Sequence, residues 1–530
     1  MSQLPDPVRE RLSQWKVFGA EHAPLPAQAT VDVAIIGSGA GGGITAELLA
    51  QAGLSVLVIE EGPLRSSRDF KQRESEAYPE LYQEAAARKT ADKAINILQG
   101  RCVGGSTTVN WTSSFRTPAG TLAFWQRQHG LQGFDVDAMA PWFERAEQRL
   151  SISDWSADPN PNNGVLARGM AALGLPAGRI RRNVKGCWNL GSCGMGCPTN
   201  AKQSMLVTTI PAALDAGARL YVQTRVQELV HDGRRVQRLI CQPVGLAGDA
   251  QGQPCEVRAR HVVLAGGAIN SPALMLRSAL PDPYGHLGRR TFLHPVVLSA
   301  ARFDERIEGW DGAPQTVYSD HFLDTQAIDG PLGFKLEVPP MHPLIMSSTM
   351  AGFGQALQGD LAQFPHSQVL LALLRDGFHP DSPGGRVRLR SDGSPELDYP
   401  ITAALQDGFR RALLAMAEIQ FAAGARDAMP LHELAPPYRS WAEAREAIAQ
   451  LPMQPYLTRV VSAHVMGGCA LSPVPELGVT RPDGRHWQLD NLSIHDGSLF
   501  PTSIGANPQL SIYGLVTRLA SGLARQLQAG

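Results

Sequence analysis

Three kinds of feature are scarce in this chain of 530 residues, and each scarcity argues against a class of protein. Only seven residues are cysteine, an odd and small number that disfavours a disulfide scaffold and suggests a reducing compartment. Lysine and arginine total 48 against 49 aspartate and glutamate residues, so the usual electrostatic basis for binding nucleic acid or an anionic membrane is missing. No run of about eighteen uncharged apolar residues occurs, which argues against a transmembrane helix.

The beginning of the chain also lacks the features of a targeting signal. Residues 1–26 carry acidic and basic side chains early, have no apolar core and contain no twin-arginine pair, so we expect a cytoplasmic protein. The stretch from Pro339 to Leu374 is apolar and methionine-rich in places. We interpret it as part of a domain core or the wall of a pocket, with peripheral membrane contact as the alternative.

Glycine (53 residues) and proline (39) are plentiful, which indicates many tight turns. The first ordered pattern consists of a strand, a glycine-rich turn, a helix and a second strand. Val31 to Ile36 is a β-branched run typical of a buried parallel strand, and a G-x-G-x-x-G sequence begins at Gly37. The helix that follows ends at Gly53, and the strand from Leu54 to Ile59 leads into Glu60. This order predicts a βαβ unit that binds a dinucleotide.

Each residue of this motif has a mechanical role. Gly37 permits the tight turn, Gly39 lets the backbone approach a pyrophosphate, and Gly42 allows close packing of helix on strand. The helix N-terminus offers free N–H groups and a partial positive charge to the phosphates. Glu60 lies 23 residues after Gly37, where an acidic side chain accepts hydrogen bonds from a ribose. The motif alone fits either NAD or FAD.

Later segments decide between the two cofactors. A second glycine-rich loop, GRCVGGSTTVN, covers residues 100–110, and its Gly104, Gly105 and Ser106 offer backbone N–H groups, while Asn110 offers an amide. A strand, a double-glycine turn and a helix follow over residues 261–276. The C-terminal stretch from Leu492 leads through several turns into an apolar helix.

These segments together resemble the glucose–methanol–choline (GMC) family of FAD-dependent oxidoreductases. The matching stretches occur in the family's order and are GSGAGGG, GRCVGGSTTVN, GGAINSPALMLRS, HVMGGCAL and IHDGSLFPTSIGANPQ. They extend from Val31 to Gln509, nearly the whole chain. Two departures are Ala279, where the family usually has glycine, and GGSTT, where GGSS is commoner. The resemblance implies an α/β fold with a Rossmann-like FAD-binding domain and a second, sheet-based (α+β) substrate domain.

Two further segments resemble the long-chain alcohol oxidase and dehydrogenase branch of the family. They are LGRRTFLHPVV (residues 287–297), which that branch places near the flavin, and the cysteine-glycine loop GSCGMGCPTNAKQS (residues 191–204). The resemblance assigns residues 28–116, 202–297 and 460–530 to the FAD-binding domain. Residues 117–201 and 298–459 then form the substrate domain.

The resemblance also implies the roles of individual residues. His464 matches the catalytic base that receives the hydroxyl proton of an alcohol, and Asn507 matches the second polar side chain that holds the same oxygen. A histidine with an ordinary pKa near ~6.5 accepts a proton around pH 7. His294 and His495 stay ambiguous between flavin contacts and structural hydrogen bonds. The implied FAD contacts are Gly37, Gly39, Gly42, Glu60, Gly104, Gly105, Ser106, Asn110, Val226, Asp496, Gly497, Asn507 and Pro508.

Three cysteines fall on one glycine-rich loop, at Cys187, Cys193 and Cys197. Three thiolates can ligate an iron–sulfur cluster or zinc, and some FAD-dependent glucose dehydrogenases of the same family have such a cluster. The alcohol oxidase branch also has cysteines here, and no C-x-x-C pair is present. We therefore favour structural thiols and expect no metal.

The resemblance leads to one favoured function and two alternatives. The favoured function is FAD-dependent oxidation of a hydrophobic alcohol, such as a medium- or long-chain, terpenoid or aromatic one, by hydride transfer to flavin N5. O₂, a quinone or a cytochrome is the expected electron acceptor. The alternatives are a flavin-dependent lyase or decarboxylase, and an FAD and iron–sulfur electron-relay subunit that acts on a sugar. The histidine and asparagine pair favours oxidation.

Overall fold

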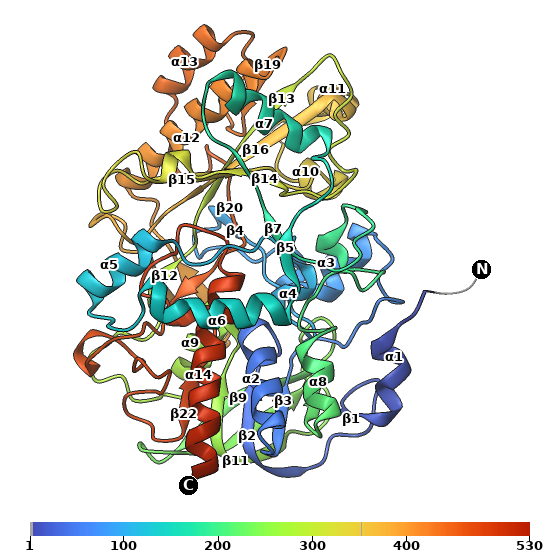
Figure 1. The fold of residues 1–530 in the computed structure, drawn as a ribbon, viewed down its shortest axis with the longest axis vertical. Coiled ribbons are helices and arrows are strands. Elements are labelled where there is room, and N and C mark those ends of the chain that lie inside the picture. Colours follow the sequence, from blue (N-terminus) through green and yellow to red (C-terminus); the bar gives the residue numbers. More distant parts are fainter. Residues whose placement is uncertain (1–3, 351, 530) are drawn as a thin grey trace.

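The computed structural model describes residues 4–350 and 352–529, which form two sheet-based layers covered by helices (Figure 1). The first layer is built around β2 (Gln28–Ile36). Side chains at the start of β2 alternate between exposed and buried, and those from Val33 to Ile35 are all buried. A continuous apolar run is what a strand needs when helices cover both faces of its sheet. The α/β architecture expected from the sequence is therefore present.

The first sheet has eight strands within the described residues. Their order is β1 (Lys16–Phe18), β8 (Arg219–Tyr221), β3 (Val56–Ile59), β2, β11 (Cys255–Leu264), β10 (Val236–Pro243) and β9 (Thr224–His231), with β22 (Leu492–Ile494) also paired to β11. The β9–β10–β11 pairings are antiparallel, and the other pairings are parallel. The sheet thus brings the N-terminal βαβ unit beside a strand from near the other end of the chain.

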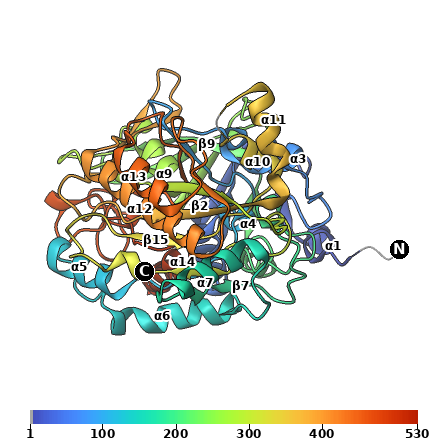
Figure 2. The ribbon, with the colours of Figure 1, turned by 90° about the horizontal axis from the view of Figure 1, so that it is seen from above.

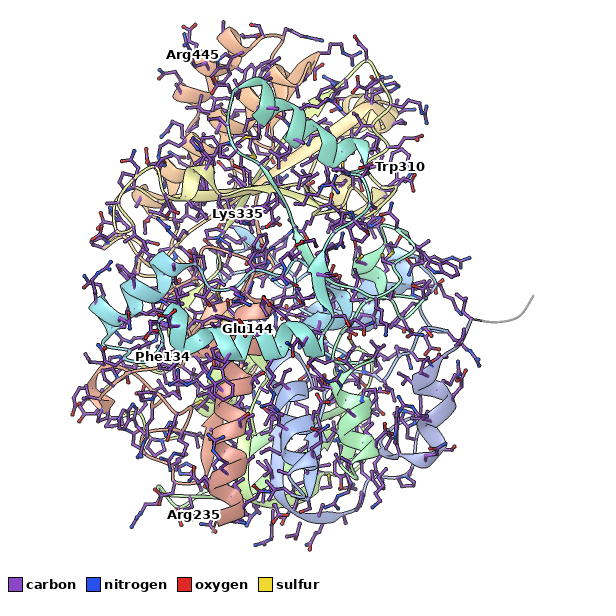
Figure 3. All side chains as sticks on the ribbon, viewed as in Figure 1. Phe134, Glu144, Arg235, Trp310, Lys335 and Arg445 are labelled. Carbon is purple, nitrogen blue, oxygen red and sulfur yellow. The ribbon has the colours of Figure 1, made fainter. Side chains whose placement is uncertain are left out.

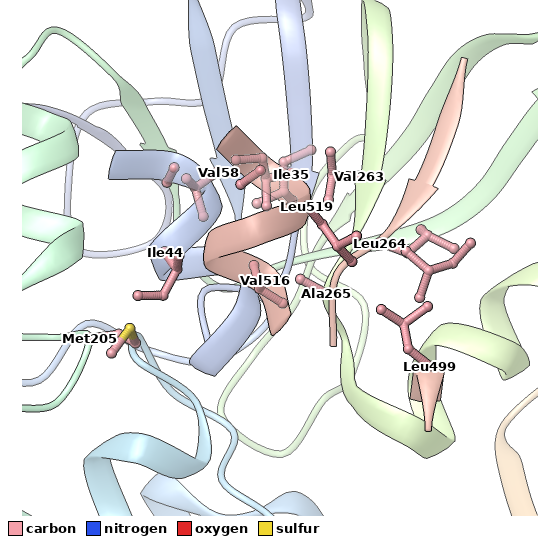
Figure 4. Close-up of a cluster of buried hydrophobic side chains, with 14 of the residues drawn as sticks. Ile35, Ile44, Val58, Met205, Val263, Leu264, Ala265, Leu499, Val516 and Leu519 are labelled. Carbon is pink, nitrogen blue, oxygen red and sulfur yellow. The ribbon is translucent and has the colours of Figure 1, made fainter. Parts of the chain in front are cut away.

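Helices α2 (Ala40–Gln51), α8 (Thr209–Asp215) and α14 (Gln509–Ala529) lie together on one face of this sheet (Figure 1). Figure 4 shows Val516 and Leu519 of α14 next to Ile35 and Val263 of the central strands. All four side chains are buried. Burial of such side chains stabilises the fold by roughly 1.5–3 kcal/mol each, so this packing fixes the strand ends where the glycine-rich turns begin.

The second layer contains another sheet, also with eight strands within the described ranges. Its order is β4 (Ile95–Ile97), β20 (Val460–Ser462), β13 (Val296–Arg302), β16 (Ser367–Leu374), β15 (Phe334–Glu337), β14 (Val317–Ser319) and β6 (Gly178–Arg179), with β19 (Asp427–Pro430) paired to β13. The helices α7 (Pro161–Ala172), α12 (Ala403–Ala422) and α13 (Trp441–Gln450) pack together above it. In the view from above, α10 (Pro343–Ser347) and α11 (Gly354–Ala362) lie on one side of the molecule and α6 (Val136–Arg149) lies on the other (Figure 2).

The chain passes between the two layers more than once. Strands β4 and β20 pair in parallel at the edge of the second sheet, although both fall in ranges that the sequence assigned to the FAD-binding domain. A smaller sheet of β18 (Pro395–Asp398), β17 (Gly385–Leu389), β12 (Arg289–Phe292) and β21 (Met466–Gly467) joins the layers at one side. The domain ranges stay a prediction. Within the described residues, no helix combines the length and the apolar character needed to cross a membrane.

Candidate active site

A cavity of about 1550 Å³ is lined by residues of both layers. The predicted site residues that line it are Gly37, Gly39, Glu60, Gly105, Ser106, Asn110, Val226, His464, Asp496, Gly497, Asn507 and Pro508. Of the described residues predicted for the site, Gly42 and Gly104 do not line this cavity. The fold therefore brings most of the predicted residues from six separate places in the chain around one space.

The turn after β2 depends on glycine for two reasons. Gly37 has φ +100, a left-handed conformation that other residues rarely adopt. A Cβ atom at Gly42 would lie 1.9 Å from the Gly37 carbonyl oxygen, and one at Gly41 would lie 1.6 Å from the His495 carbonyl oxygen. Gly42 thus allows the helix to approach the strand, which explains its place behind the cavity lining. The absence of these side chains keeps the N-terminus of α2 open toward the cavity.

Glu60 follows β3 and is held by its neighbours. Its Oε2 accepts hydrogen bonds from the backbone N–H (3.0 Å) and the hydroxyl (2.6 Å) of Ser38, and its Oε1 accepts one from the Gly62 N–H at 2.8 Å. Burial raises the pKa of Glu60, and these hydrogen bonds oppose that effect. A carboxylate has about four acceptor positions, so capacity remains for a hydroxyl group in the cavity.

The second glycine-rich loop packs directly on the first. Gly105 has φ +53, and a Cβ atom there would lie 2.8 Å from the Cα atom of Gly39. The Gly104 N–H donates to the Ser38 hydroxyl at 2.9 Å, so Gly104 joins the two loops rather than lining the cavity. Asn110 lines the cavity, yet its Nδ2 donates to Gln509 Oε1 at 2.7 Å. Its amide is therefore already engaged with the C-terminal segment.

A buried lysine holds this second loop in place. The Lys202 ammonium donates to the backbone carbonyls of Thr108, Asn110 and Cys193, each at 2.7 Å. Burial lowers the pKa of Lys202 to about 8. Nothing in the sequence distinguishes Lys202, because a lone lysine in a glycine-rich segment gives no signal of burial. Lys202 ties the second glycine-rich loop to the cysteine loop.

Asp496 joins the C-terminal segment to the double-glycine turn. Its Oδ1 accepts from the Ser498 N–H at 2.8 Å, and its Oδ2 accepts from the Gly267 N–H at 2.9 Å and the Ser271 hydroxyl at 2.6 Å. These contacts place Gly497 and the start of α9 (Gly267–Arg277) side by side at the cavity. Val226, on β9, lines another part of the cavity, and its carbonyl accepts a hydrogen bond from Arg277 at 3.2 Å.

His464 and Asn507 line the same cavity. His464 is half-buried between β20 and β21, and burial lowers its pKa to about 4, so its imidazole is neutral at pH 7. Its Nδ1 lies 3.1 Å from Nδ1 of His294. Asn507 is buried, its Nδ2 donates to Glu337 Oε2 at 3.2 Å, and its Oδ1 has no hydrogen-bond partner among the described residues. The cavity thus contains a neutral imidazole and an amide oxygen free to bind a ligand.

Glu337 is a site residue that sequence reasoning missed. It lies at the end of β15, has 0% of its surface exposed and also accepts a hydrogen bond at Oε2 from Gln315 Nε2 (2.8 Å). Burial raises its pKa to about 7, and nearby Lys335 opposes this shift. Lys335 lies in the interior of the second layer (Figure 3). The sequence signal that could have pointed to Glu337 is the presence of two charged residues in the short strand FKLE.

One part of the cavity is apolar. Side chains from three strands of the second sheet face it, and proline, leucine, isoleucine and methionine side chains from the segment before α11 complete it. These residues are Val296, Leu298, Leu371, Leu373, Val461, Pro339, Pro340, Leu344, Ile345 and Met346. Part of the apolar stretch noted in the sequence is thus a pocket wall. Phe353, in the same stretch, is 88% exposed.

The cysteine loop lies outside the cavity lining. Cys187 accepts a hydrogen bond from the Asn189 N–H at 3.4 Å, Cys193 lies 3.8 Å from an Arg182 nitrogen, and Cys197 lies 3.4 Å from the Thr199 hydroxyl. In the part of the chain that the structure describes, no three histidine, cysteine, aspartate or glutamate side chains are grouped so as to hold a metal ion. Each of the three cysteines thus has its own neighbouring group in the loop or in an adjacent segment.

The mostly parallel sheet of the first layer and the glycine-lined cavity at its strand ends define a dinucleotide-binding protein. Residues 78–296 match the N-terminal GMC oxidoreductase model and residues 380–515 match the C-terminal GMC oxidoreductase model. An uncharacterised GMC-type oxidoreductase of Mycobacterium tuberculosis is 30% identical over 502 residues, which cover 94% of this chain and 76% of that protein. The chain therefore belongs to the GMC oxidoreductase family and is an FAD-dependent oxidoreductase.

Two other relatives are informative. A long-chain-alcohol oxidase of Arabidopsis thaliana (FAO4B) is 27% identical over 523 residues, covering 94% of this chain and 68% of that protein. The crystal structure of pyridoxine 4-oxidase from Mesorbium loti superposes with a TM-score of 0.69 at 20% identity, covering 94% of this chain and 99% of that one. This likeness confirms the predicted fold class.

The residues of the cavity fit FAD. The glycine contacts leave the N-terminus of α2 unobstructed, as a pyrophosphate requires, and the Glu60 carboxylate lies at the end of the neighbouring strand. The unpartnered Asn507 Oδ1 shows that the cavity wall offers a polar contact that the described protein groups do not use. The individual FAD contacts predicted from the sequence stay proposals.

Proposed function

We propose that this protein oxidises a hydrophobic alcohol to an aldehyde or ketone, with His464 as the base. The observation that carries the proposal is that His464 and Asn507 line one cavity with both glycine-rich loops and with an apolar wall. FAD, when bound, supplies the hydride acceptor. The glycines, Glu60 and Asp496 bind and orient that cofactor in this proposal.

The chain's own residues handle the proton and the oxygen. The alcohol O–H bond breaks as its proton passes to the free imidazole nitrogen of His464, while the alcohol carbon gives up a hydride and the C=O bond forms. The burial that lowers the pKa of His464 also keeps its imidazole neutral, and so able to accept a proton, at neutral pH. Asn507 holds the substrate oxygen through the second N–H of its amide nitrogen, whose orientation the hydrogen bond to Glu337 fixes.

The apolar wall supports a hydrophobic substrate. Leucine and valine side chains from β13, β16 and β20 offer the substrate no charged partner. Each buried methylene contributes about 0.8 kcal/mol, so a longer alkyl chain binds more tightly as long as the wall can cover it. The Arabidopsis relative named as a long-chain-alcohol oxidase supports the same substrate class.

The test is the visible spectrum of the purified holoenzyme under anaerobic conditions. Addition of a primary alkanol of medium chain length should bleach the flavin bands, and a polyol of equal carbon number should do so more slowly. His464→Ala should retain FAD and lose at least about 100-fold in the rate of bleaching. Admission of air, or of a quinone, then identifies the electron acceptor.

Two outcomes would contradict the proposal. If the His464→Ala variant bleaches at the original rate, His464 is not the base. If product forms while the flavin stays oxidised throughout, the chemistry is that of a lyase. Faster bleaching by the polyol than by the alkanol would overturn the hydrophobic substrate but leave the oxidation in place.

A further inference from the structure

His294 makes a contact that the proposed function does not use. It lies in the turn between β12 and β13, and its Nδ1 is 3.1 Å from Nδ1 of His464. The planes of the two rings differ by 28° and their centroids are 5.3 Å apart, so the rings meet edge to edge. A nitrogen–nitrogen distance of this length is a hydrogen bond, so one of the two atoms carries a proton and the other accepts it.

The backbone of His294 is held by a separate set of hydrogen bonds. Its φ is +48, a left-handed conformation that histidine adopts more readily than most residues other than glycine, asparagine and aspartate. Asp376, which follows β16, accepts the His294 N–H at Oδ1 and the Leu293 N–H at Oδ2, both at 3.1 Å. The Tyr399 hydroxyl donates to the same carboxylate at 2.7 Å. These hydrogen bonds hold the backbone of the turn, and the turn places the ring of His294 against His464.

The direction of the hydrogen bond decides whether His464 can act as a base. If Nδ1 of His294 is the donor, the proton of neutral His464 lies on Nε2, which then cannot accept a second one. If Nδ1 of His464 is the donor, its Nε2 carries a free lone pair. Only the second arrangement lets His464 take a proton without first losing one.

The surroundings of His294 keep it neutral. It is fully buried, and burial lowers its pKa well below the ordinary value, an effect to which His464, Lys335 and Arg375 add. The charged groups that face it are Lys335 from β15, with Arg375 and Asp376 from the segment that follows β16. A proton taken up by the pair therefore stays on His464, and His294 remains an acceptor.

We propose that His294 is a positioning residue that accepts the Nδ1 proton of His464 and so presents the Nε2 lone pair of His464 to the substrate. The inference rests on the proposed function, because it matters only if His464 is the base. When the alcohol proton reaches Nε2, the existing Nδ1–H···N hydrogen bond becomes charge-assisted and stabilises the imidazolium. Hydrogen-bond partners that orient metal-ligating histidines typically contribute about 10- to 100-fold, and we expect a contribution of the same order from His294.

The test uses three substitutions that tolerate a positive φ. His294→Gly removes the acceptor, His294→Asp places an oxygen at the same number of bonds from Cα and can only accept, and His294→Asn can accept or donate. His261→Gln is the control, since His261 is also buried and contacts the Ser493 hydroxyl at 2.8 Å, away from the cavity. The readouts are the anaerobic rate of flavin bleaching at saturating alcohol, the alcohol dissociation constant and the pH profile.

We expect His294→Gly to slow bleaching by about 10- to 100-fold with little change in the alcohol dissociation constant. His294→Asp should recover most of that loss and move the acidic limb of the pH profile to higher pH, because a carboxylate stabilises protonated His464. His294→Asn should lie between the two, and His261→Gln should bleach at the original rate.

A His294→Gly variant that bleaches at the original rate overturns the inference, as does a His294→Asp variant that is as slow as His294→Gly over the whole pH range. The proposed function fails separately, through His464→Ala. If His464→Ala abolishes bleaching while His294→Gly does not alter it, the base assignment stands and only the positioning role is wrong. FAD content and thermal stability of every variant identify any loss that is due to misfolding.

Discussion

Replacing Glu337 by glutamine should change the pH dependence of stability in a defined direction. Glu337 is fully buried, and one of its oxygens accepts hydrogen bonds from Gln315 and Asn507. Glutamine keeps an oxygen acceptor of the same shape and cannot ionise. The substitution therefore isolates the effect of the charge from that of the hydrogen bonds.

The magnitude follows from the two pKa values. Burial raises the pKa of Glu337 from 4.5 to about 7, so the folded protein keeps this proton to a higher pH than the unfolded chain. The group therefore stabilises the fold most below pH 4.5, and its contribution is lost as the pH rises through about 7. Integrated from pH 5 to pH 8, the loss is about 2.5 kcal/mol, and the Glu337→Gln variant does not undergo it.

Thermal unfolding of both proteins at pH 5 and pH 8 measures this difference, and other titrating groups cancel in the comparison. For a chain of this length about 1 kcal/mol corresponds to roughly 1 °C in Tm. The Tm of the variant minus that of the original protein should therefore be about 2–3 °C larger at pH 8 than at pH 5. A variant that instead loses stability at pH 8 would refute the reasoning. That result would mean that Glu337 is ionised in the fold and paired with Lys335.

Three further substitutions test other features of the structure. Gly41→Ala should lower stability by about 3 kcal/mol in a thermal melt, because its Cβ would meet the His495 carbonyl. The control Gly522→Ala adds a Cβ in open space on α14 and should not lower stability. Equal melting temperatures of the two variants would contradict this prediction. Lys202→Met leaves three carbonyls unpaired, so it should lower stability by about 3 kcal/mol and weaken FAD retention. Unchanged FAD content after dialysis would argue against a role of Lys202 in holding the second glycine-rich loop. Leu371→Trp narrows the apolar wall and should lower kcat/KM for the longest alkanols by about 10-fold while sparing short ones; a uniform loss would place this wall away from the alkyl chain.

The fold could be predicted from the sequence because its decisive signals are local. The turn at Gly37 needs a positive φ, and the packing behind Gly42 needs the absence of a Cβ, so both requirements appear within six residues. The buried run of β2 has the same local character. Patterns of this kind determine which residues form the parallel sheet and where its turns open.

The details of the site depend on contacts between distant segments. His294 and His464 are 170 positions apart, and so are Asn507 and Glu337, so no spacing rule relates the members of either pair. Asn110 was expected to face the cofactor through its amide, but Gln509, 399 positions later, takes up that amide. Hydrogen-bond partners of this kind follow from the tertiary packing.

The position of β22 bears on how the chain folds as it is synthesised. Residues 492–494 pair with β11 at the point where β11 also pairs with β2, so β11 lacks one of its two parallel neighbours until residue 494 has left the ribosome. The side of β11 next to β22 presents unpaired backbone groups until then. A nascent chain stalled before residue 492 therefore exposes a strand edge on which chaperones or other nascent chains can act.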